Sequence, residues 1–264
     1  MIRLGIAGAC GKMGQRIGSL AAADHEFSIA GALEWDKSHW LGMEYGRLLG
    51  IDKGKAKVEA DAGAVIGKID VLVDFAVGND VLTHVKIARE RKVKMVIGTT
   101  GIGDAGMAEI QAAAKEIPIV MDSNMSLGIN TILEKLGQIA DALGPAYDID
   151  IIETHHRMKK DWPSGTGLNI AKVLEERIGR GIRKDGQPRS GQEIVVHSLR
   201  GGDVVGDHTV VFAGPGERVE VTHRASSRDV FAYGALRAAK FVMQMKPGKL
   251  YKMLDVMGVN HHGN

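Results

Sequence analysis

Cysteine is almost missing from this sequence: Cys10 is the only one among 264 residues. A single cysteine forms no disulfide within the chain, and a zinc site built from several cysteines is excluded. No apolar run approaches the roughly 20 residues of a membrane-spanning helix, and the N-terminus lacks the charged-then-apolar layout of a signal peptide. We therefore expect a cytoplasmic protein without a membrane partner.

An excess of charge of either sign is also lacking. Lysine and arginine together number 34 against 32 acidic residues, which gives a net charge of +2. Such a balanced chain is not typical of a nucleic-acid-binding protein, and we expect no nucleic-acid partner. The length and the 44% hydrophobic content suit one large globular domain or two modest ones.

What is present at the N-terminus is a strand pattern, Ile2–Ala7, followed by the glycine loop GACGKMG and a helical pattern. This order of strand, turn and helix is the context in which a glycine motif predicts dinucleotide binding. Gly8 and Gly11 leave the backbone open to a pyrophosphate, and the helix start supplies free N–H groups. The spacing Gly8-x-x-Gly11-x-x-Gly14 departs from the commoner fingerprint, which has glycine in place of Ala9. A tight turn without a ligand is therefore the alternative.

A second strand pattern ends at Glu34, about 20 residues after Gly14, where an acid is expected to accept hydrogen bonds from a ribose. Trp35 follows it in place of an arginine, so the usual partner of a 2′-phosphate is missing. Lys12 and Arg16 lie close to the phosphate loop and are the alternative cations. We expect NADH as the cofactor, with NADPH as the alternative.

Strand and helix patterns then alternate, which predicts a parallel sheet with helices on both faces. Ligands bind such sheets at the carboxyl ends of the strands, which singles out Phe75, Gly98–Thr100 and Asp122–Met125. These residue types are also common in turns and helix caps, and the spacing alone does not decide between the two interpretations. The expected strands are 70–75, 94–100 and 117–122, and the expected helices are 79–92 and 104–116.

The pattern changes after Ser126. Three strand-like runs separated by short turns predict an antiparallel meander, and the basic, glycine-rich stretch 179–192 predicts a surface loop. An apolar sheet face in this part would need a cover, which a partner subunit would provide. The expected strands are 147–156, 193–200, 207–214 and 217–225, and the expected helices are 128–143, 166–180, 229–245 and a short one near Leu250.

The most distinctive stretch is ETHHRMKKDWPSGTG, Glu153 to Gly167. His155 and His156 are of the residue type that exchanges protons most readily near neutral pH, and Lys159 adds a positive charge or a proton. The run Ser164–Thr166 opens the next helix, where hydroxyls and N–H groups make an anion site. Together these residues predict a pocket for a carboxylate-bearing molecule, although each alone also suits a structural histidine, a solvated loop or a cap. No acid or cysteine set completes a metal site, and we expect none.

This stretch resembles the signature E-x-H-H-x-x-K-x-D-x-P-S-G-T of the dihydrodipicolinate reductase family, which acts on the diaminopimelate route to lysine. Similar segments follow the family's order along nearly the whole chain: GACGKMG, GTTG at 98–101, NMSLG at 124–128, the run 200–228 and the tail 246–259. Trp162 stands where the family more often has alanine, and Trp35 stands where some members carry a basic residue.

The resemblance implies reduction of 4-hydroxy-tetrahydrodipicolinate, a small cyclic dicarboxylate, to tetrahydrodipicolinate by NADH or NADPH with loss of water. The implied fold is α/β: a Rossmann-like doubly wound parallel sheet over 1–126, onto which 237–264 packs back. A smaller α+β domain with a mixed, largely antiparallel sheet follows over 127–236 and forms a homotetramer. Closure of the two domains is expected to bring the hydride donor to the substrate.

The resemblance also implies roles for individual residues. His155 matches the proton donor, and Lys159 matches the second proton-donating and substrate-polarising residue. The implied substrate contacts are His156, Ser164, Gly165, Thr166 and Thr100. The implied cofactor contacts are Gly8, Ala9, Cys10, Gly11, Lys12, Met13, Glu34, Gly98, Thr99, Thr100, Asp122, Ser123, Asn124 and Met125.

Two other classes of protein were considered. A semialdehyde dehydrogenase uses similar glycine spacing but needs a cysteine nucleophile in its second domain. Cys10 lies in the glycine loop, so this class is excluded. A non-catalytic nucleotide sensor is compatible with the fold, but it needs no proton donor, and His155 with Lys159 favours an enzyme.

Overall fold

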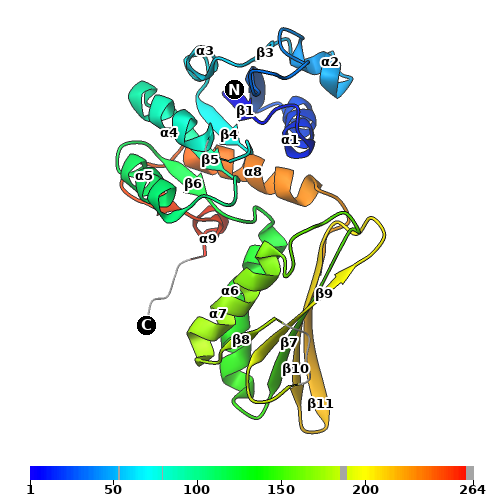
Figure 1. Cartoon of the computed structure of the whole chain (residues 1–264). Coiled ribbons are helices and arrows are strands. Elements are labelled where there is room, and N and C mark those ends of the chain that lie inside the picture. Colours follow the sequence, from blue (N-terminus) through cyan, green and yellow to red (C-terminus); the bar gives the residue numbers. More distant parts are fainter. Residues whose placement is uncertain (53, 79, 185–188, 260–264) are drawn as a thin grey trace. The chain divides into compact units, whose positions relative to one another are not determined.

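The computed structural model describes residues 1–52, 54–78, 80–184 and 189–259. They form two compact units, the first comprising Met1–Ser126 with the chain from Asp229 onward, and the second Leu127–Arg228 (Figure 1). From the sequence, the chain is expected to pack back onto the first unit from residue 237 onward. In the structure it does so from Asp229, where the helix α8 (Asp229–Val242) begins, and this helix belongs to the first unit over its full length. Residues 185–188 of the expected surface loop lie outside the described residues.

A seven-stranded sheet in the order β12-β6-β5-β4-β1-β2-β3 forms the centre of the first unit. All of its pairings are parallel. The chain order reverses between β1 and β4, because β2 and β3 extend the sheet on one side and β5 and β6 on the other. The strands are β1 (Ile2–Ala7), β2 (Phe27–Leu33), β3 (Val58–Glu59), β4 (Val71–Asp74), β5 (Lys94–Ile97), β6 (Ile119–Met121) and β12 (Leu250–Tyr251).

Helices cover both faces of this sheet, so the expected doubly wound fold is confirmed (Figure 1). The helices α1 and α8 pack together on one face, while α3, α4 and α5 pack on the other. Among the described residues, no helix is long and apolar enough to cross a membrane. The helices are α1 (Lys12–Ala23), α2 (Tyr45–Leu49), α3 (Ala62–Ile66), α4 (Asp80–Arg91), α5 (Asp104–Ala114), α8 (Asp229–Val242) and α9 (Met253–Met257).

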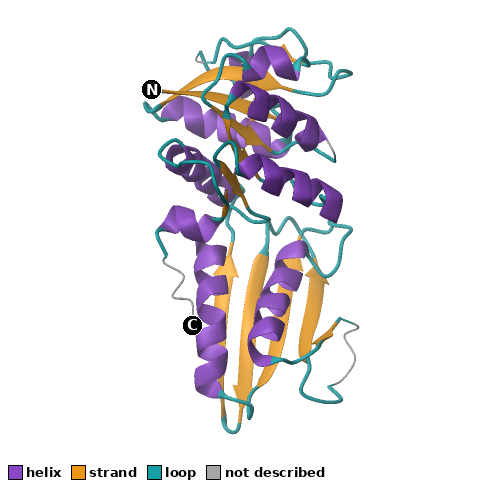
Figure 2. Ribbon diagram, turned by 90° about the vertical axis from the view of Figure 1, so that its left-hand side faces the viewer, coloured by secondary structure: helices purple, strands orange, loops and turns teal. Residues whose placement is uncertain are grey.

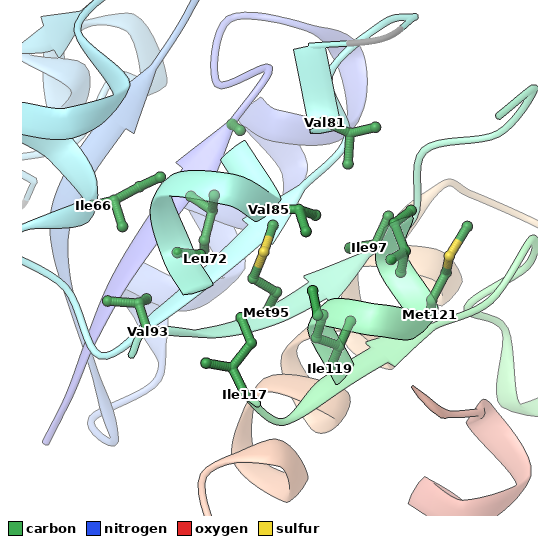
Figure 3. Packing of buried hydrophobic residues seen from close by; sticks show 14 of the residues in the cluster. Ile66, Leu72, Val81, Val85, Val93, Met95, Ile97, Ile117, Ile119 and Met121 are labelled. Atoms are coloured by element: carbon green, nitrogen blue, oxygen red, sulfur yellow. The ribbon is translucent and has the colours of Figure 1, made fainter. Parts of the chain in front are cut away.

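The hydrophobic core of the first unit forms where the central strands meet α4 and α5. Figure 3 shows part of this cluster, with Val85 of α4 beside Leu72 of β4 and Met95 of β5. All three side chains are almost completely buried. Strands that are covered on both faces need apolar side chains on both, and each fully buried aliphatic side chain contributes about 1.5–3 kcal/mol. This packing fixes the carboxyl ends of the strands.

The second unit is a five-stranded sheet in the order β11-β10-β7-β9-β8, and both of its helices lie on one face (Figure 2). Side chains of β7 alternate between buried and partly exposed, as expected for a strand with one covered face. The elements are α6 (Leu127–Leu143), β7 (Asp148–His155), α7 (Gly165–Ile178), β8 (Ile182–Arg183), β9 (Ile194–Arg200), β10 (Asp207–Gly214) and β11 (Glu217–Arg224).

The expected three-stranded meander is wrong in one respect. β10 and β11 form an antiparallel hairpin, and β10 is also antiparallel to β7. β9, however, lies on the other side of β7 and runs parallel to it. The helix α7 makes this parallel crossover possible, because a strand–helix–strand unit places its two strands side by side in one sheet. The second sheet is therefore mixed, as expected, with antiparallel pairing on one side of β7 and parallel pairing on the other.

Candidate active site

The glycine loop lies at the carboxyl end of β1, where the chain order of the sheet reverses. Gly8 has a φ of +70°, and a Cβ on it would lie 2.8 Å from the carbonyl oxygen of Phe75, which follows β4. A Cβ on Gly14 would collide with the carbonyl oxygens of Gly8 and Ala9. These glycines therefore allow α1 to approach the sheet closely at the position where open α/β sheets bind their ligands.

Glu34, which directly follows β2, is held by the loop. The backbone N–H of Cys10 donates to Glu34 Oε2 at 2.8 Å, and that of Trp35 donates to Oε1 at 3.2 Å. Each oxygen retains acceptor capacity for a ligand hydroxyl. Burial, together with the neighbouring Glu34 charge, raises the pKa of the Cys10 thiol to about 12. Cys10 is therefore a neutral thiol and not a nucleophile.

A cavity of about 630 Å³ opens beside Glu34 in the first unit. The predicted cofactor contacts Gly8, Gly11 and Glu34 line it, whereas the other predicted contacts lie outside its walls. Most of the remaining lining was not predicted, Phe75 excepted, because residues scattered along the chain carry no motif. The remaining lining residues are Leu33, Trp35, Asp36, Ala60, Ala62, Phe75, Ala76, Val77, Asp80, Thr83 and His84.

The two cations considered for a 2′-phosphate differ in their surroundings. The Arg16 guanidinium forms a two-pronged ion pair with Asp229 of α8, at 2.6 and 2.8 Å. Lys12 is exposed at the first position of α1. Asp36 adds a second acid to the cavity wall beside Glu34.

A buried polar cluster at the end of β4 was not predicted. Asp74 is fully buried, and its Oδ1 accepts hydrogen bonds from the backbone N–H of Ala76 at 2.9 Å and from Thr99 Oγ1 at 3.2 Å. Its Oδ2 lies 2.7 Å from Nδ1 of His84, a residue of the cavity wall. The available signal was an acid at the end of the apolar run VLVD, since buried carboxylates are rare without partners.

The predicted contacts after β5 and β6 lie at the same edge of the sheet. The ring of Phe75 packs against Gly98 and leaves no room for a side chain there. Asp122 accepts hydrogen bonds from the backbone N–H groups of Asn124, at 3.4 Å, and Met253, at 3.1 Å. Asp122 therefore fixes the start of α9, and Met125 is buried. The cofactor roles of Gly98–Thr100 and Asp122–Met125 remain predictions.

In the second unit, β7 ends in a buried pair of side chains. Glu153 and His155 point to the same face because they are two residues apart, and His155 Nδ1 is hydrogen-bonded to Glu153 Oε2. Glu153 Oε1 accepts from Arg200 Nη2 at 2.8 Å and from the backbone N–H of Ser164 at 3.3 Å. Burial alone raises the pKa of Glu153, but the bonds from His155 and Arg200 outweigh it, and the pKa lies well below its usual range. Glu153 is therefore ionised.

The loop after β7 carries the predicted cation. Lys159 Nζ lies 2.8 Å from Asp161 Oδ2, and Arg200 donates to the backbone carbonyl of Asp161 at 2.7 Å. The backbone N–H of Gly201 donates to the carbonyl of His155 at 2.9 Å. The end of β9 thus fixes the loop that bears Lys159. His156 directly follows the strand end and is partly exposed.

Ser164 caps the N-terminus of α7. Its Oγ accepts from the backbone N–H of Gly167 at 3.0 Å and lies 3.3 Å from Nε2 of His208. The His208 ring meets the ring of His155 edge-on, with centroids 5.2 Å apart. Burial lowers the pKa of His208 to about 4, so this ring is neutral at neutral pH. Gly165 and Thr166 lie in the first turn, where a helix carries partial positive charge.

Within the described residues, Glu153, His155 and His208 form a set whose ligand atoms lie within 4.8 Å of one another. Each oxygen of Glu153 already has a donor, from His155 on one side and from Arg200 on the other. The guanidinium also opposes a second cation at this place. Hydrogen bonds therefore explain this cluster.

Comparison with known proteins assigns the chain to a family. Two family models match it: dihydrodipicolinate reductase, N-terminus, at residues 2–125, and dihydrodipicolinate reductase, C-terminus, at residues 128–257. The 4-hydroxy-tetrahydrodipicolinate reductase of Cupriavidus pinatubonensis is 44% identical over 266 residues. That of Syntrophobacter fumaroxidans is 40% identical over 267 residues. Each match covers 98% of this chain and 100% of the relative.

Solved structures are also similar to this chain. The dipicolinate-bound dihydrodipicolinate reductase from Paenisporosarcina sp. TG-14 is similar with a TM-score of 0.76 and 25% identity, over 97% of this chain and 98% of that chain. The amine dehydrogenase from Mycobacterium smegmatis has a TM-score of 0.62 at 14% identity, over 94% of each chain. The second similarity shows the fold alone.

Proposed function

This chain belongs to the dihydrodipicolinate reductase family and is an NAD(P)H-dependent oxidoreductase of the diaminopimelate route to lysine, and on this premise we propose how its residues divide the work. It reduces 4-hydroxy-tetrahydrodipicolinate to tetrahydrodipicolinate with loss of water. The reduced nicotinamide, when bound, supplies a hydride. His155 and Lys159 donate the protons that the reduced substrate needs.

The observation that carries this proposal is the buried pair at the end of β7. His155 is hydrogen-bonded through Nδ1 to the ionised Glu153, which leaves Nε2 to exchange a proton with a ligand. Lys159 follows four residues later on a loop fixed by Asp161 and Arg200. A nucleotide sensor has no need for two proton donors held in this way.

The substrate is a small dicarboxylate, and we assign its carboxylates to the start of α7. The first turn of this helix carries Gly165 and Thr166 behind the capping Ser164, and helix N-termini attract anions. His156, beside the end of β7, is the further proposed contact. Thr100, in the first unit, is proposed on the family resemblance alone.

We propose NADH as the preferred cofactor. The cavity beside the glycine loop presents two acids, Glu34 and Asp36, and negative charge repels a 2′-phosphate. Arg16 is paired with Asp229. Lys12 is the cation that would support NADPH, as the alternative. The loops Gly98–Thr100 and Asp122–Met125 are proposed to contact the nicotinamide half.

Oxidation of the two cofactors tests the proposal. The substrate is made in place from pyruvate and aspartate semialdehyde by the preceding synthase, and the near-ultraviolet absorbance of the reduced nicotinamide is followed. The expected result is oxidation that depends on the synthase and is faster with NADH than with NADPH. Protein that binds NADH but oxidises neither cofactor would favour the nucleotide sensor. A cytoplasmic location and a homotetramer are further proposals.

A further inference from the structure

We propose that Glu153 is a positioning residue for the reduction: it holds the His155 ring with a proton on Nδ1, so that Nε2 is the atom that exchanges a proton with the substrate. Arg200 holds Glu153 in place and keeps it charged. This inference rests on the proposed role of His155 as the proton donor, and it assigns two further residues, Glu153 and Arg200, a role through that side chain.

The geometry leaves the His155 ring one orientation. Nδ1 is bound to Glu153 Oε2, and Glu153 is completely buried, so no water competes for the carboxylate. A carboxylate only accepts hydrogen bonds, hence Nδ1 carries the proton. Nε2 lies near Gly206, where a Cβ would come within 3.0 Å of it. Glycine at position 206 therefore keeps the reactive nitrogen clear of a side chain.

A charged pair adjoins the His155 ring. Glu153 is the acid that touches the ring, and Arg200 lies 2.8 Å from its other oxygen. The other titratable neighbours are His208, which is neutral, and Lys159, whose ammonium is paired with Asp161. An ionised carboxylate stabilises an imidazolium that forms beside it. Glu153 is therefore the charged group that acts most directly on the His155 ring.

Glu153 also connects the proton donor to the anion-binding start of α7. The oxygen that accepts from Arg200 accepts from the backbone N–H of Ser164 as well. One buried carboxylate thus sets the position of the ring and of the first turn of the helix. In Glu153→Gln the amide oxygen can still accept from Ser164 and Arg200, so the first turn of α7 stays in place and this variant is expected to affect the chemical step more than substrate binding.

The test compares Glu153→Gln with a matched control, Asp150→Asn. Asp150 lies on the same strand but on its other face, and its Oδ1 lies 2.9 Å from His197 Nε2, so the control also removes a carboxylate from a histidine. Glu153→Gln is expected to lower kcat about 10- to 100-fold, a part of the roughly 100- to 10,000-fold that general acids supply. The Michaelis constant for the substrate should change less than kcat.

The pH profile separates this role from a merely structural one. A proton donor loses activity as it deprotonates, and a ring without its carboxylate deprotonates more easily. The alkaline decline of kcat in Glu153→Gln is therefore expected at lower pH than in the wild type and in Asp150→Asn. Glu153→Asp, which keeps the charge, should recover part of both effects. A Glu153→Gln variant with the kcat and pH profile of the control overturns the inference.

Three further measurements complete the test. Nitrogen NMR of labelled histidine reports the Nδ1 proton of His155 without turnover; the proton should be present in the wild type and lost from Nδ1 in Glu153→Gln. Arg200→Gln should lower kcat in the same direction by a smaller factor, and no change in it contradicts the role of Arg200. His155→Asn separates the two proposals: if it retains full turnover, the proposed role of His155 as the proton donor fails, and this inference with it. If it is inactive while Glu153→Gln matches the control, only this inference fails.

Discussion

Single residues of the first unit decide which nucleotide fits. Glu34 is fixed by the backbone of Cys10 and Trp35, with acceptor capacity left over. Glu34→Gln is expected to raise the Michaelis constant for NADH about fivefold, because a net hydrogen bond is worth about 1 kcal/mol. The preference for NADH over NADPH should fall, since the charge that repels a phosphate is removed. Initial rates with both cofactors measure this, with the exposed Glu109→Gln as control. An unchanged preference would contradict the role of Glu34.

Some residues of the two candidate sites follow from the sequence, and others do not. His155, Lys159 and Glu34 were predicted, because they lie in a dense local motif or at a fixed spacing from one. Asp74 and His84 were not, because their pairing joins a strand to a helix that follows ten residues later in the chain. Partners of this kind follow from packing and leave no local pattern. Glu153 was quoted as part of the motif, but its contact with Arg200 depends on the pairing of β9 with β7.

The capping residue of α7, Ser164, is expected to contribute both to the stability of the protein and to substrate binding. Ser164→Ala removes the acceptor for the backbone N–H of Gly167, and such a loss costs about 1 kcal/mol of stability, whereas glycine at the cap costs only a few tenths. Both Ser164→Ala and Ser164→Gly should raise the Michaelis constant for the substrate by a similar factor. Urea denaturation and steady-state kinetics of the pair check this. Equal Michaelis constants in both variants and the wild type would exclude Ser164 from substrate binding.

Helices and strands with a strong local sequence pattern were predicted more reliably than the pairing of strands in the sheets. The apolar strands and long helices of both units lie close to their expected ranges. The placement of β9 was wrong, because three short strands separated by turns have the same pattern whether they pair in series or not. The helix α7 determines the pairing, because its crossover brings β9 beside β7. The two-residue strands β3, β8 and β12 are too short to carry a periodic pattern.

The buried His208 makes the stability of the folded protein depend on pH. Burial lowers its pKa in the folded state to about 4 from the ordinary 6.5, so between these values the unfolded chain binds a proton that the folded protein does not. The free energy of unfolding is therefore complete above about pH 6.5 and falls as the pH drops towards 4, by on the order of 3 kcal/mol. Denaturation across this range should show a smaller slope for His208→Gln than for the wild type. Equal slopes would contradict this assignment.

The chain is also expected to assemble into an oligomer. Apolar side chains are exposed in the second unit, among them Leu199 (53%) on β9 and Trp162 (66%) in the loop before α7. Both line one surface hollow together with Ile152 and Val196, and a contiguous exposed apolar patch is typical of an interface. We expect a homotetramer by sedimentation, and a smaller species for Leu199→Asp. A wild-type monomer would rule out the proposed assembly.

The end of β7 and the loop after it are proposed to carry the two proton donors of the reductase. The most direct test is the double variant His155→Asn, Lys159→Met, assayed for substrate-dependent NADH oxidation and, separately, for NADH binding by fluorescence. We expect turnover to fall by about 100- to 10,000-fold while NADH binding is retained. Turnover within a few-fold of the wild type would contradict it.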